Sequence, residues 1–279
     1  MLHVSPIPLI FVLLTSFFGI QEEPPKSQVI PVNLLLVGGG GTTDAIRAHA
    51  LAQLGGAKKT KLLVIPQASE RKEAGREIAK MWGKDGVKNI KIMDVRKTAR
   101  SKKQIEEANF IWMGGGSQSR LMEALKEGKL IGAIKKRAKE GVLIGGTSAG
   151  TAVMTKIMIA QGRGRSIDRE AVELGFGLGL LKGTIVDQHF LARARFNRLV
   201  SAVLEHPEKL GIGIDEKTAI FVHGQKFEVV GNSGVVVVDG SQAISKDKNG
   251  PKGTWSGIQL SILRPGSRFD MTKRKILGP

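Results

Sequence analysis

The sequence predicts an α/β fold in which a mostly parallel sheet is covered by helices on both faces. Short apolar runs alternate along the chain with helical segments, as parallel strands joined by crossover helices do. Glycine-rich turns follow three of the runs, at 38–41, 114–116 and 145–150. Because ligands bind beyond the carboxyl ends of strands in such sheets, these turns also indicate where a site would lie.

Five apolar runs are expected to be the strands, at 32–39, 61–69, 88–95, 109–116 and 142–146. Helical segments are expected between them, at 42–56, 73–86, 102–108 and 119–141. Residues 220–240 contain valine-rich runs separated by glycine and asparagine, a pattern that predicts antiparallel strands completing the same sheet. The glycines at 38–41 lack the lysine of a phosphate loop, so we interpret them as a turn before a helix N-cap.

The N-terminus differs from the rest of the chain. Residues 7–20 are apolar, and no Asp, Glu, Lys or Arg precedes Glu22. The segment 1–20 is interpreted as a secretory signal peptide, with an uncleaved membrane anchor as the alternative. It is followed by a linker at 21–30 and a single α/β domain at 31–279, so a secreted or periplasmic location is expected.

Composition excludes several classes of site. The chain has no cysteine, which excludes disulfides, thiolate zinc sites and a cysteine nucleophile. Its net charge is +18, but the basic residues are spread along the chain without the interleaved aromatic residues of RNA-binding surfaces. We therefore expect a solvated basic surface and no specific nucleic-acid partner. A non-catalytic protein that binds polyanions is the alternative from another class.

The segment 146–150 reads Gly-Thr-Ser-Ala-Gly and follows an apolar run. A strand, a sharp turn and a helix beginning within 151–159 would expose the hydroxyl of Ser148 as a nucleophile. The backbone N–H of Ala149 would then help to hold a developing oxyanion. The alternative is a glycine-rich turn that only packs against a helix.

A serine nucleophile needs a base and an acid that orients the base. Of the five histidines, His189 follows an apolar run and has the most polar neighbours. Asp215 and Glu216 follow another apolar run and are candidates for the acid, with a buried, structural role for one of them as the alternative. Three carboxylates in the loop before His189 compete with them: Asp168, Glu170 and Glu173.

Three segments in order, GGGSQSRLMEAL, GGTSAGTAVM and DQHFLARARFNRLVSAVLEHPEKLGIGIDEKTAIFV, resemble the serine-peptidase family that contains cyanophycinase and aspartyl dipeptidase. The resemblance covers roughly residues 30–240. It implies a flavodoxin-like fold related to class I glutamine amidotransferases, with serine in place of the cysteine nucleophile.

The resemblance also implies roles for single residues. Ser148 matches the family's nucleophile, His189 its base and Glu216 its acid. Gln118 matches a glutamine of the substrate pocket. The polar pocket around the histidine is matched by Asp187, Gln188, Arg193, Arg195 and Arg198. The oxyanion donors would be backbone N–H groups of Ala149, Gly115 and Gly116.

The implied activity is hydrolysis of cyanophycin, a poly-aspartate that carries arginine on its side chains, to β-Asp-Arg dipeptides through an acyl-enzyme. No metal or organic cofactor is implied, and a homodimer is compatible with the sequence. Two departures stand out: Phe196-Asn197 replaces leucine-glycine, and the loop at 161–165 is basic where the family has an acid. The basic loop favours, as the alternative, an aspartyl or isoaspartyl dipeptidase of the same family.

Overall fold

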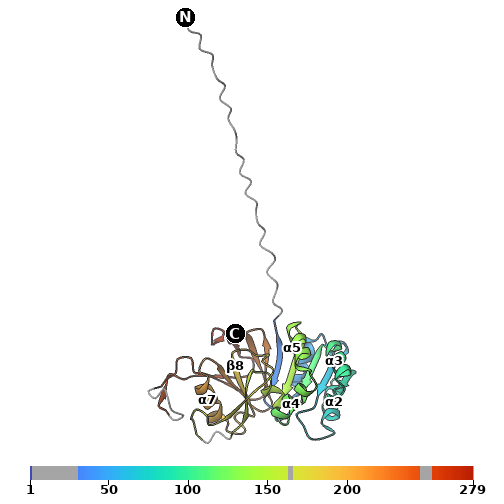
Figure 1. Cartoon of the computed structure of the whole chain (residues 1–279), viewed down its shortest axis with the longest axis horizontal. Helices are drawn as coiled ribbons and strands as arrows, with labels where there is room; N and C mark the ends of the chain where they lie inside the picture. Colours follow the sequence, from blue (N-terminus) through green and yellow to red (C-terminus); the bar gives the residue numbers. More distant parts are fainter. Residues whose placement is uncertain (2–30, 163–165, 246–252, 279) are drawn as a thin grey trace.

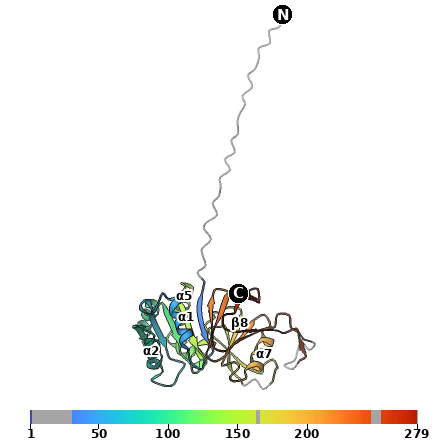
Figure 2. The same ribbon diagram turned by 180° about the vertical axis from the view of Figure 1, so that it is seen from behind.

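The computed structural model describes residues 1, 31–162, 166–245 and 253–278. The predicted leader at 1–20 and the linker at 21–30 therefore lie outside the described residues, apart from Met1. The described chain is built around two sheets that lie side by side (Figures 1 and 2). Within this part of the chain, every helix is too short or too polar to traverse a bilayer.

Nine of the described strands form the larger sheet. Its parallel part has the order β3-β2-β4-β5-β1, which confirms the predicted mostly parallel arrangement. These strands are β1 (Asn33–Val37), β2 (Lys61–Ile65), β3 (Asn89–Ile92), β4 (Phe110–Met113) and β5 (Leu143–Thr147). Antiparallel strands extend it beyond β1: β10 (Thr218–His223), β11 (Lys226–Gly231), β16 (Arg268–Asp270) and β17 (Lys275–Leu277).

Helices cover both faces of the parallel strands. One face carries α1 (Asp44–Gln53) and α2 (Ala74–Lys84). The other carries α3 (Thr98–Glu107), α4 (Gln118–Glu127) and α5 (Ile131–Lys139). The helical stretch expected at 119–141 is thus two helices, separated where Lys129 adopts a positive φ of 51°. A short 3₁₀ helix, Ala57–Lys59, precedes β2.

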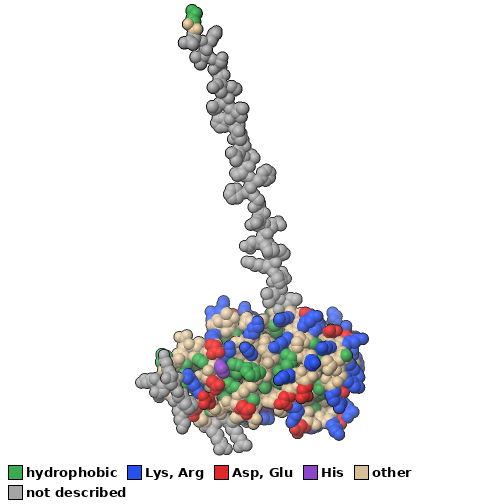
Figure 3. All heavy atoms as spheres, in the orientation of Figure 1, with side chains coloured by type: hydrophobic (Ala, Val, Ile, Leu, Met, Phe, Trp, Pro, Cys, Tyr) green, Lys and Arg blue, Asp and Glu red, His purple; other side chains and the backbone are tan. Residues whose placement is uncertain are grey.

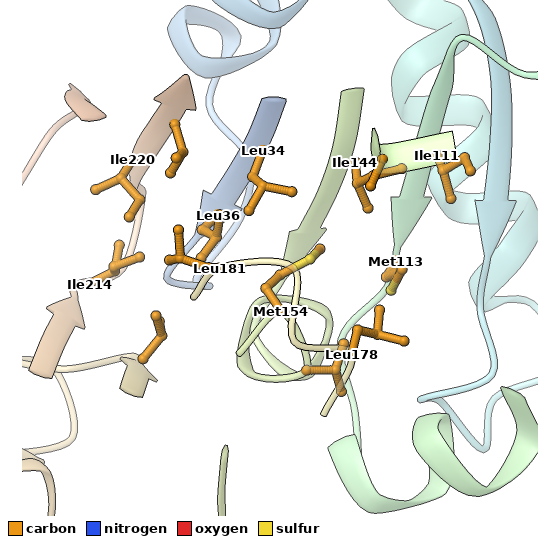
Figure 4. Close-up of a cluster of buried hydrophobic side chains, with 14 of the residues drawn as sticks. Leu34, Leu36, Ile111, Met113, Ile144, Met154, Leu178, Leu181, Ile214 and Ile220 are labelled. Carbon is orange, nitrogen blue, oxygen red and sulfur yellow. The ribbon is translucent and has the colours of Figure 1, made fainter. Parts of the chain in front are cut away.

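Alternation along β1 decides which core each side chain joins. Leu35 and Val37 pack with Trp82 of α2, while Leu34 and Leu36 face the opposite core. That second core continues past Met154 and Leu178 to Ile214 in the neighbouring sheet (Figure 4). The two sheets therefore share one hydrophobic cluster.

The smaller sheet has four strands in the order β15-β12-β9-β8, of which only β8 and β9 are parallel. They are β8 (Thr184–Gln188), β9 (Leu210–Ile214), β12 (Val235–Asp239) and β15 (Gln259–Leu263). The far face is covered by α7 (Phe196–Glu205). The strands expected at 220–240 thus divide between the sheets, because every residue of β12 is buried and needs a central position, here between β9 and β15.

The prediction of a helix within 151–159 is wrong. After one turn, α6 (Ala149–Ala152), the carbonyl of Val153 accepts from Leu178 N–H and that of Met154 from Leu181 N–H, at 2.6 and 2.9 Å. With those carbonyls occupied by distant donors, the helix ends. The chain continues as a hairpin of β6 (Ile157–Gln161) and β7 (Glu173–Phe176), and a second small hairpin pairs β13 (Ile244–Ser245) with β14 (Trp255–Ser256).

Charged side chains on the face drawn in Figure 3 are mixed in sign. Lys and Arg are scattered among acidic, polar and apolar groups and do not form one continuous patch there. Many form surface ion pairs, such as Arg76 with Glu73 and Arg96 with Asp94. Exposed pairs of this kind contribute little to stability.

Candidate active site

Ser148 stands at the sharp turn between β5 and α6. Its backbone has φ 54° and ψ −113°, a strained conformation for a residue with a side chain. The flanking glycines are needed for close approach: a Cβ on Gly146 would lie 2.5 Å from the carbonyl carbon of Gly150, and one on Gly150 would lie 2.3 Å from Met113 O. The G-x-S-x-G pattern therefore forms the expected elbow, although the helix behind it is short.

The structure brings three predicted side chains together at this turn. His189 Nε2 lies 3.0 Å from Ser148 Oγ, and His189 Nδ1 lies 2.5 Å from Glu216 Oε1. Ser148 comes from the larger sheet, whereas His189 follows β8 and Glu216 follows β9 of the smaller one. This is the distance pattern of a nucleophile, a base and an orienting acid.

Burial sets the protonation state of the base. It lowers the pKa of His189 below its ordinary 6.5, and the positive charge of Arg193 acts in the same direction. The hydrogen bond to Glu216 raises the pKa, but less than burial lowers it. At neutral pH the imidazole is therefore neutral and can accept a proton.

The neighbouring carboxylate, Asp215, has a different task. Its Oδ1 accepts the N–H groups of Leu191 and Ala192, at 3.1 and 3.0 Å, and its Oδ2 accepts the hydroxyl of Ser233 at 2.7 Å. Burial would raise the pKa of Asp215, but these hydrogen bonds outweigh it and hold the pKa low. Asp215 thus holds the turn that follows His189, which is the structural role expected for one of these two neighbouring carboxylates.

The three competing carboxylates lie away from the imidazole. Asp168 and Glu170 precede β7, and their N–H groups are bonded to Ser201 and Glu205 of α7. Glu173 begins β7. Glu216 is the carboxylate that contacts His189.

Two of the predicted substrate contacts are bonded to each other. Arg198 donates to both carboxylate oxygens of Asp187 at 2.6 and 2.5 Å, and both side chains are almost fully buried. Arg198 also donates to Gly162 O. The polar atoms of this pair are thus bonded within the protein, which gives both residues a structural role, and their contact with a substrate stays a prediction.

Gln118 and Gln188 are also held by protein groups. Gln118 Nε2 donates to the carbonyls of Ile159 and Ala160 in β6, at 2.9 and 2.7 Å, so its amide joins α4 to that strand. Gln188 Oε1 lies 3.5 Å from Ser148 Oγ and accepts from Arg195 at 2.9 Å. Burial lowers the pKa of Arg195 to about 10, which leaves the guanidinium charged at neutral pH. Arg193 is exposed.

Two of the three predicted oxyanion donors, Gly115 and Ala149, lie next to the serine. A Cβ on Gly115 would lie 3.3 Å from Ser148 Cβ and 3.8 Å from its Oγ, so this backbone passes directly beside the hydroxyl. Gly116 has φ 138°, and a Cβ there would lie 2.1 Å from Ala68 O. Ala149 begins α6. Among the described residues, no three His, Asp or Glu side chains come together as a metal site.

Comparison with known proteins identifies the family of the chain. The model of peptidase family S51 matches residues 34–230. The chain is 37% identical to cyanophycinase of Geminocystis herdmanii, over 83% of this chain and 91% of that protein. It is 34% identical to cyanophycinase of a Nostoc species, over 85% and 86%.

Two solved structures share the fold. A peptidase from an acI-B1 actinobacterium has a TM-score of 0.61 at 22% identity, covering 87% of this chain and 98% of that one. A putative peptidase E from Listeria monocytogenes has a TM-score of 0.54 at 18% identity, covering 73% and 100%. Because the family model spans most of the chain and the relatives exceed 30% identity, this protein is a serine-type peptidase and belongs to peptidase family S51.

Proposed function

We propose that the protein hydrolyses cyanophycin and releases β-Asp-Arg dipeptides. The observation that carries the proposal is the contact of Ser148, His189 and Glu216 in a chain one third identical to several cyanophycinases over most of its length. Serine peptidases use such a set to split one difficult hydrolysis into acylation and deacylation.

Acylation begins with proton transfer. His189 Nε2 accepts the proton of Ser148 Oγ as the oxygen attacks the aspartyl carbonyl carbon. Glu216 accepts the Nδ1 hydrogen bond, so it fixes the tautomer and stabilises the imidazolium that forms. The imidazolium then gives its proton to the leaving amine, and the C–N bond breaks to leave an ester on Ser148.

The negative charge of the tetrahedral intermediate needs donors beside the hydroxyl. The N–H groups of Ala149, Gly115 and Gly116 are proposed to supply them, supported by the approach of Gly115 to Ser148 Oγ. One such donor contributes about 10²–10³-fold in rate. Deacylation repeats the cycle: His189 takes a proton from water, hydroxide adds to the ester, and Ser148 Oγ leaves with the proton.

Recognition of a terminal carboxylate is proposed for the exposed guanidinium of Arg193. The proposal is supported by its closeness to the base, since the charge of Arg193 lowers the pKa of His189. Guanidinium pairs with carboxylate through two parallel hydrogen bonds. Arg195 would act indirectly, because it donates a hydrogen bond to Gln188 Oε1.

The test uses the purified protein on insoluble cyanophycin, with Ser148→Ala in parallel and mass spectrometry of the soluble products. We expect β-Asp-Arg from the wild type and a loss of at least about 10⁴-fold in Ser148→Ala. Full activity in Ser148→Ala would overturn the mechanism. Activity on α-Asp-X dipeptides with none on cyanophycin would replace the substrate by that of the dipeptidase alternative, which the basic residues at 161–165 motivate.

Export is proposed for the first 20 residues. The apolar run at 7–20 followed by polar residues supports a signal peptide. The N-terminal peptide of the protein recovered from cell fractions tests it: a new N-terminus between residues 15 and 31 in a soluble exported fraction is expected. An intact Met1 in the membrane fraction would instead support the anchor.

A further inference from the structure

Three consecutive carbonyls at the end of β1 accept hydrogen bonds from the three segments that carry the triad. Val37 O accepts from Ser148 N–H at 3.0 Å. Gly38 O accepts from His189 N–H at 2.7 Å, and Gly39 O accepts from Lys217 N–H, next to Glu216, at 2.8 Å. One short piece of backbone therefore fixes the positions of the backbone segments that carry the nucleophile, the base and the acid relative to one another.

The three donors share an unusual conformation. Ser148, His189 and Lys217 have φ of 54°, 50° and 54°, in the left-handed region that residues with side chains seldom adopt. Such a conformation is unfavourable for a residue with a side chain and persists only where its surroundings enforce it. The carbonyls of β1 and of the glycines after it are the shared partners of all three.

The glycines after β1 also lie in direct contact with two side chains of the triad. A Cβ on Gly39 would lie 2.3 Å from His189 Cε1 and 2.4 Å from Nε2, the atom that faces Ser148. A Cβ on Gly40 would lie 2.5 Å from Glu216 Oε2 and 2.8 Å from its Cδ. No other residue type leaves room for both the imidazole and the carboxylate.

We propose that the segment 37–40 is the positioning element of the triad: its carbonyls fix the backbone of the three catalytic segments, and Gly39 and Gly40 hold the His189 ring and the Glu216 carboxylate in line with Ser148. The segment belongs to the larger sheet, whereas His189 and Glu216 extend from the smaller one. It is thus the part of the chain that aligns the two sheets at the site.

The chain contains its own control for this proposal. Gly41 lies in the same turn with φ 106°, close to the 111° of Gly39, but a Cβ on it would meet nothing within 4 Å. Gly41→Ala and Gly39→Ala therefore impose similar backbone strain, and only Gly39→Ala pushes on the imidazole. A displacement of about 1 Å at a catalytic group can cost about 100-fold in rate.

The first experiment measures kcat, KM and thermal unfolding of the wild type, Gly39→Ala and Gly41→Ala. We expect Gly39→Ala to lose about 100-fold in kcat with KM changed less than about threefold, and Gly41→Ala to keep kcat within about threefold at a comparable melting temperature. Equal losses in the two variants would overturn the proposal, because strain alone would then explain them. So would an unchanged kcat in Gly39→Ala.

A second measurement does not depend on the substrate proposed above. In ¹⁵N-histidine-labelled protein, the proton between His189 Nδ1 and Glu216 gives a strongly downfield signal, assigned by its absence in His189→Gln. We expect the signal to persist in Gly41→Ala and to shift or vanish in Gly39→Ala and Gly40→Ala. An unchanged signal in folded Gly40→Ala would overturn the proposal even if Gly39→Ala failed to fold, and a wild type inactive on cyanophycin would leave this readout intact.

Discussion

The two sheets hold their parts of the site by partly different forces. Around the strands that carry Ser148, the core is apolar, with Trp82, Phe110 and Trp112 in edge-to-face contact. Around His189, the apolar core under α7 also encloses charged groups: Asp187 with Arg198, and Asp215 with its backbone and hydroxyl donors. Apolar packing thus supports both parts of the site, but the part around the base adds buried ion pairs and carboxylate hydrogen bonds, so the positions of His189 and Glu216 should be the more sensitive to single polar changes.

Glu216→Gln removes the negative charge beside His189 and should have the largest effect. We expect kcat to fall about 10³–10⁴-fold with little change in melting temperature, because the amide has the same shape but cannot stabilise the imidazolium. Steady-state kinetics measure the change in kcat, and thermal unfolding measures the melting temperature. Glu173→Gln, at a carboxylate away from the ring, is the control and should keep wild-type kcat; a loss below tenfold in Glu216→Gln would show that the base does not depend on this carboxylate.

Arg198→Met removes both guanidinium hydrogen bonds to the buried carboxylate of Asp187 and leaves it the more distant cation Arg195, whose Nη1 lies 3.6 Å from Oδ1. We expect the free energy of unfolding to fall by about 3–5 kcal/mol in chemical denaturation. Arg137→Met, which removes an ion pair with Glu140 and a hydrogen bond to Ala108 O beside the larger sheet, should cost less, about 1–2 kcal/mol. The double variant Asp187→Leu with Arg198→Met should recover part of the loss; equal effects of Arg198→Met and Arg137→Met would remove the contrast between the two regions.

Arg193→Ala tests the exposed cation beside the base. We expect KM for substrates with a free carboxylate to rise about tenfold, because a charge-assisted hydrogen bond is lost, with a smaller change in kcat. Stability should not change, since the side chain is exposed. Arg76→Ala, an exposed arginine on α2, serves as the control, and an equal KM in the two variants would argue against carboxylate binding at Arg193.

The pH dependence should show the smallest effect. Burial lowers the pKa of His189, so the base stays neutral as the pH falls and the acid limb of kcat/KM should have its midpoint below 6.5. The unfolded chain binds this proton at higher pH than the folded one. The stability from the neutral imidazole is thus fully present above 6.5 and lost as the pH falls toward the folded pKa. A midpoint above 6.5 would mean that Glu216 outweighs burial.

Local patterns were sufficient for the parallel part of the larger sheet. Its five strands are short apolar runs separated by helical segments, whereas β16 and β17 were not predicted. Ser148 was predicted for the same reason, since its turn is defined within 146–150. The short α6 was not predictable, because it ends on hydrogen bonds from residues 178 and 181.

The smaller sheet needed more than local pattern. Glu216 was chosen over Asp215 by resemblance, and only the contacts of Asp215 with Leu191 and Ser233 explain why the two differ. Asp187 and Arg198 looked like pocket residues because polar types suit both a pocket and a buried ion pair. The glycines at 38–41 were interpreted as a turn, since nothing in their sequence says that Gly39 lies against an imidazole.

The position of β12 and β15 has a consequence for folding during synthesis. The strand that leads to Glu216, β9, is flanked on one side by β12, and β12 in turn by β15, which ends at Leu263. The match to the peptidase family ends at residue 230. On the ribosome, the sheet that holds the base and the acid stays incomplete until residue 263 has emerged, whereas the segment bearing the nucleophile emerges more than 100 residues earlier. In a nascent chain, Ser148 is therefore present long before the sheet that holds His189 and Glu216 can complete the site.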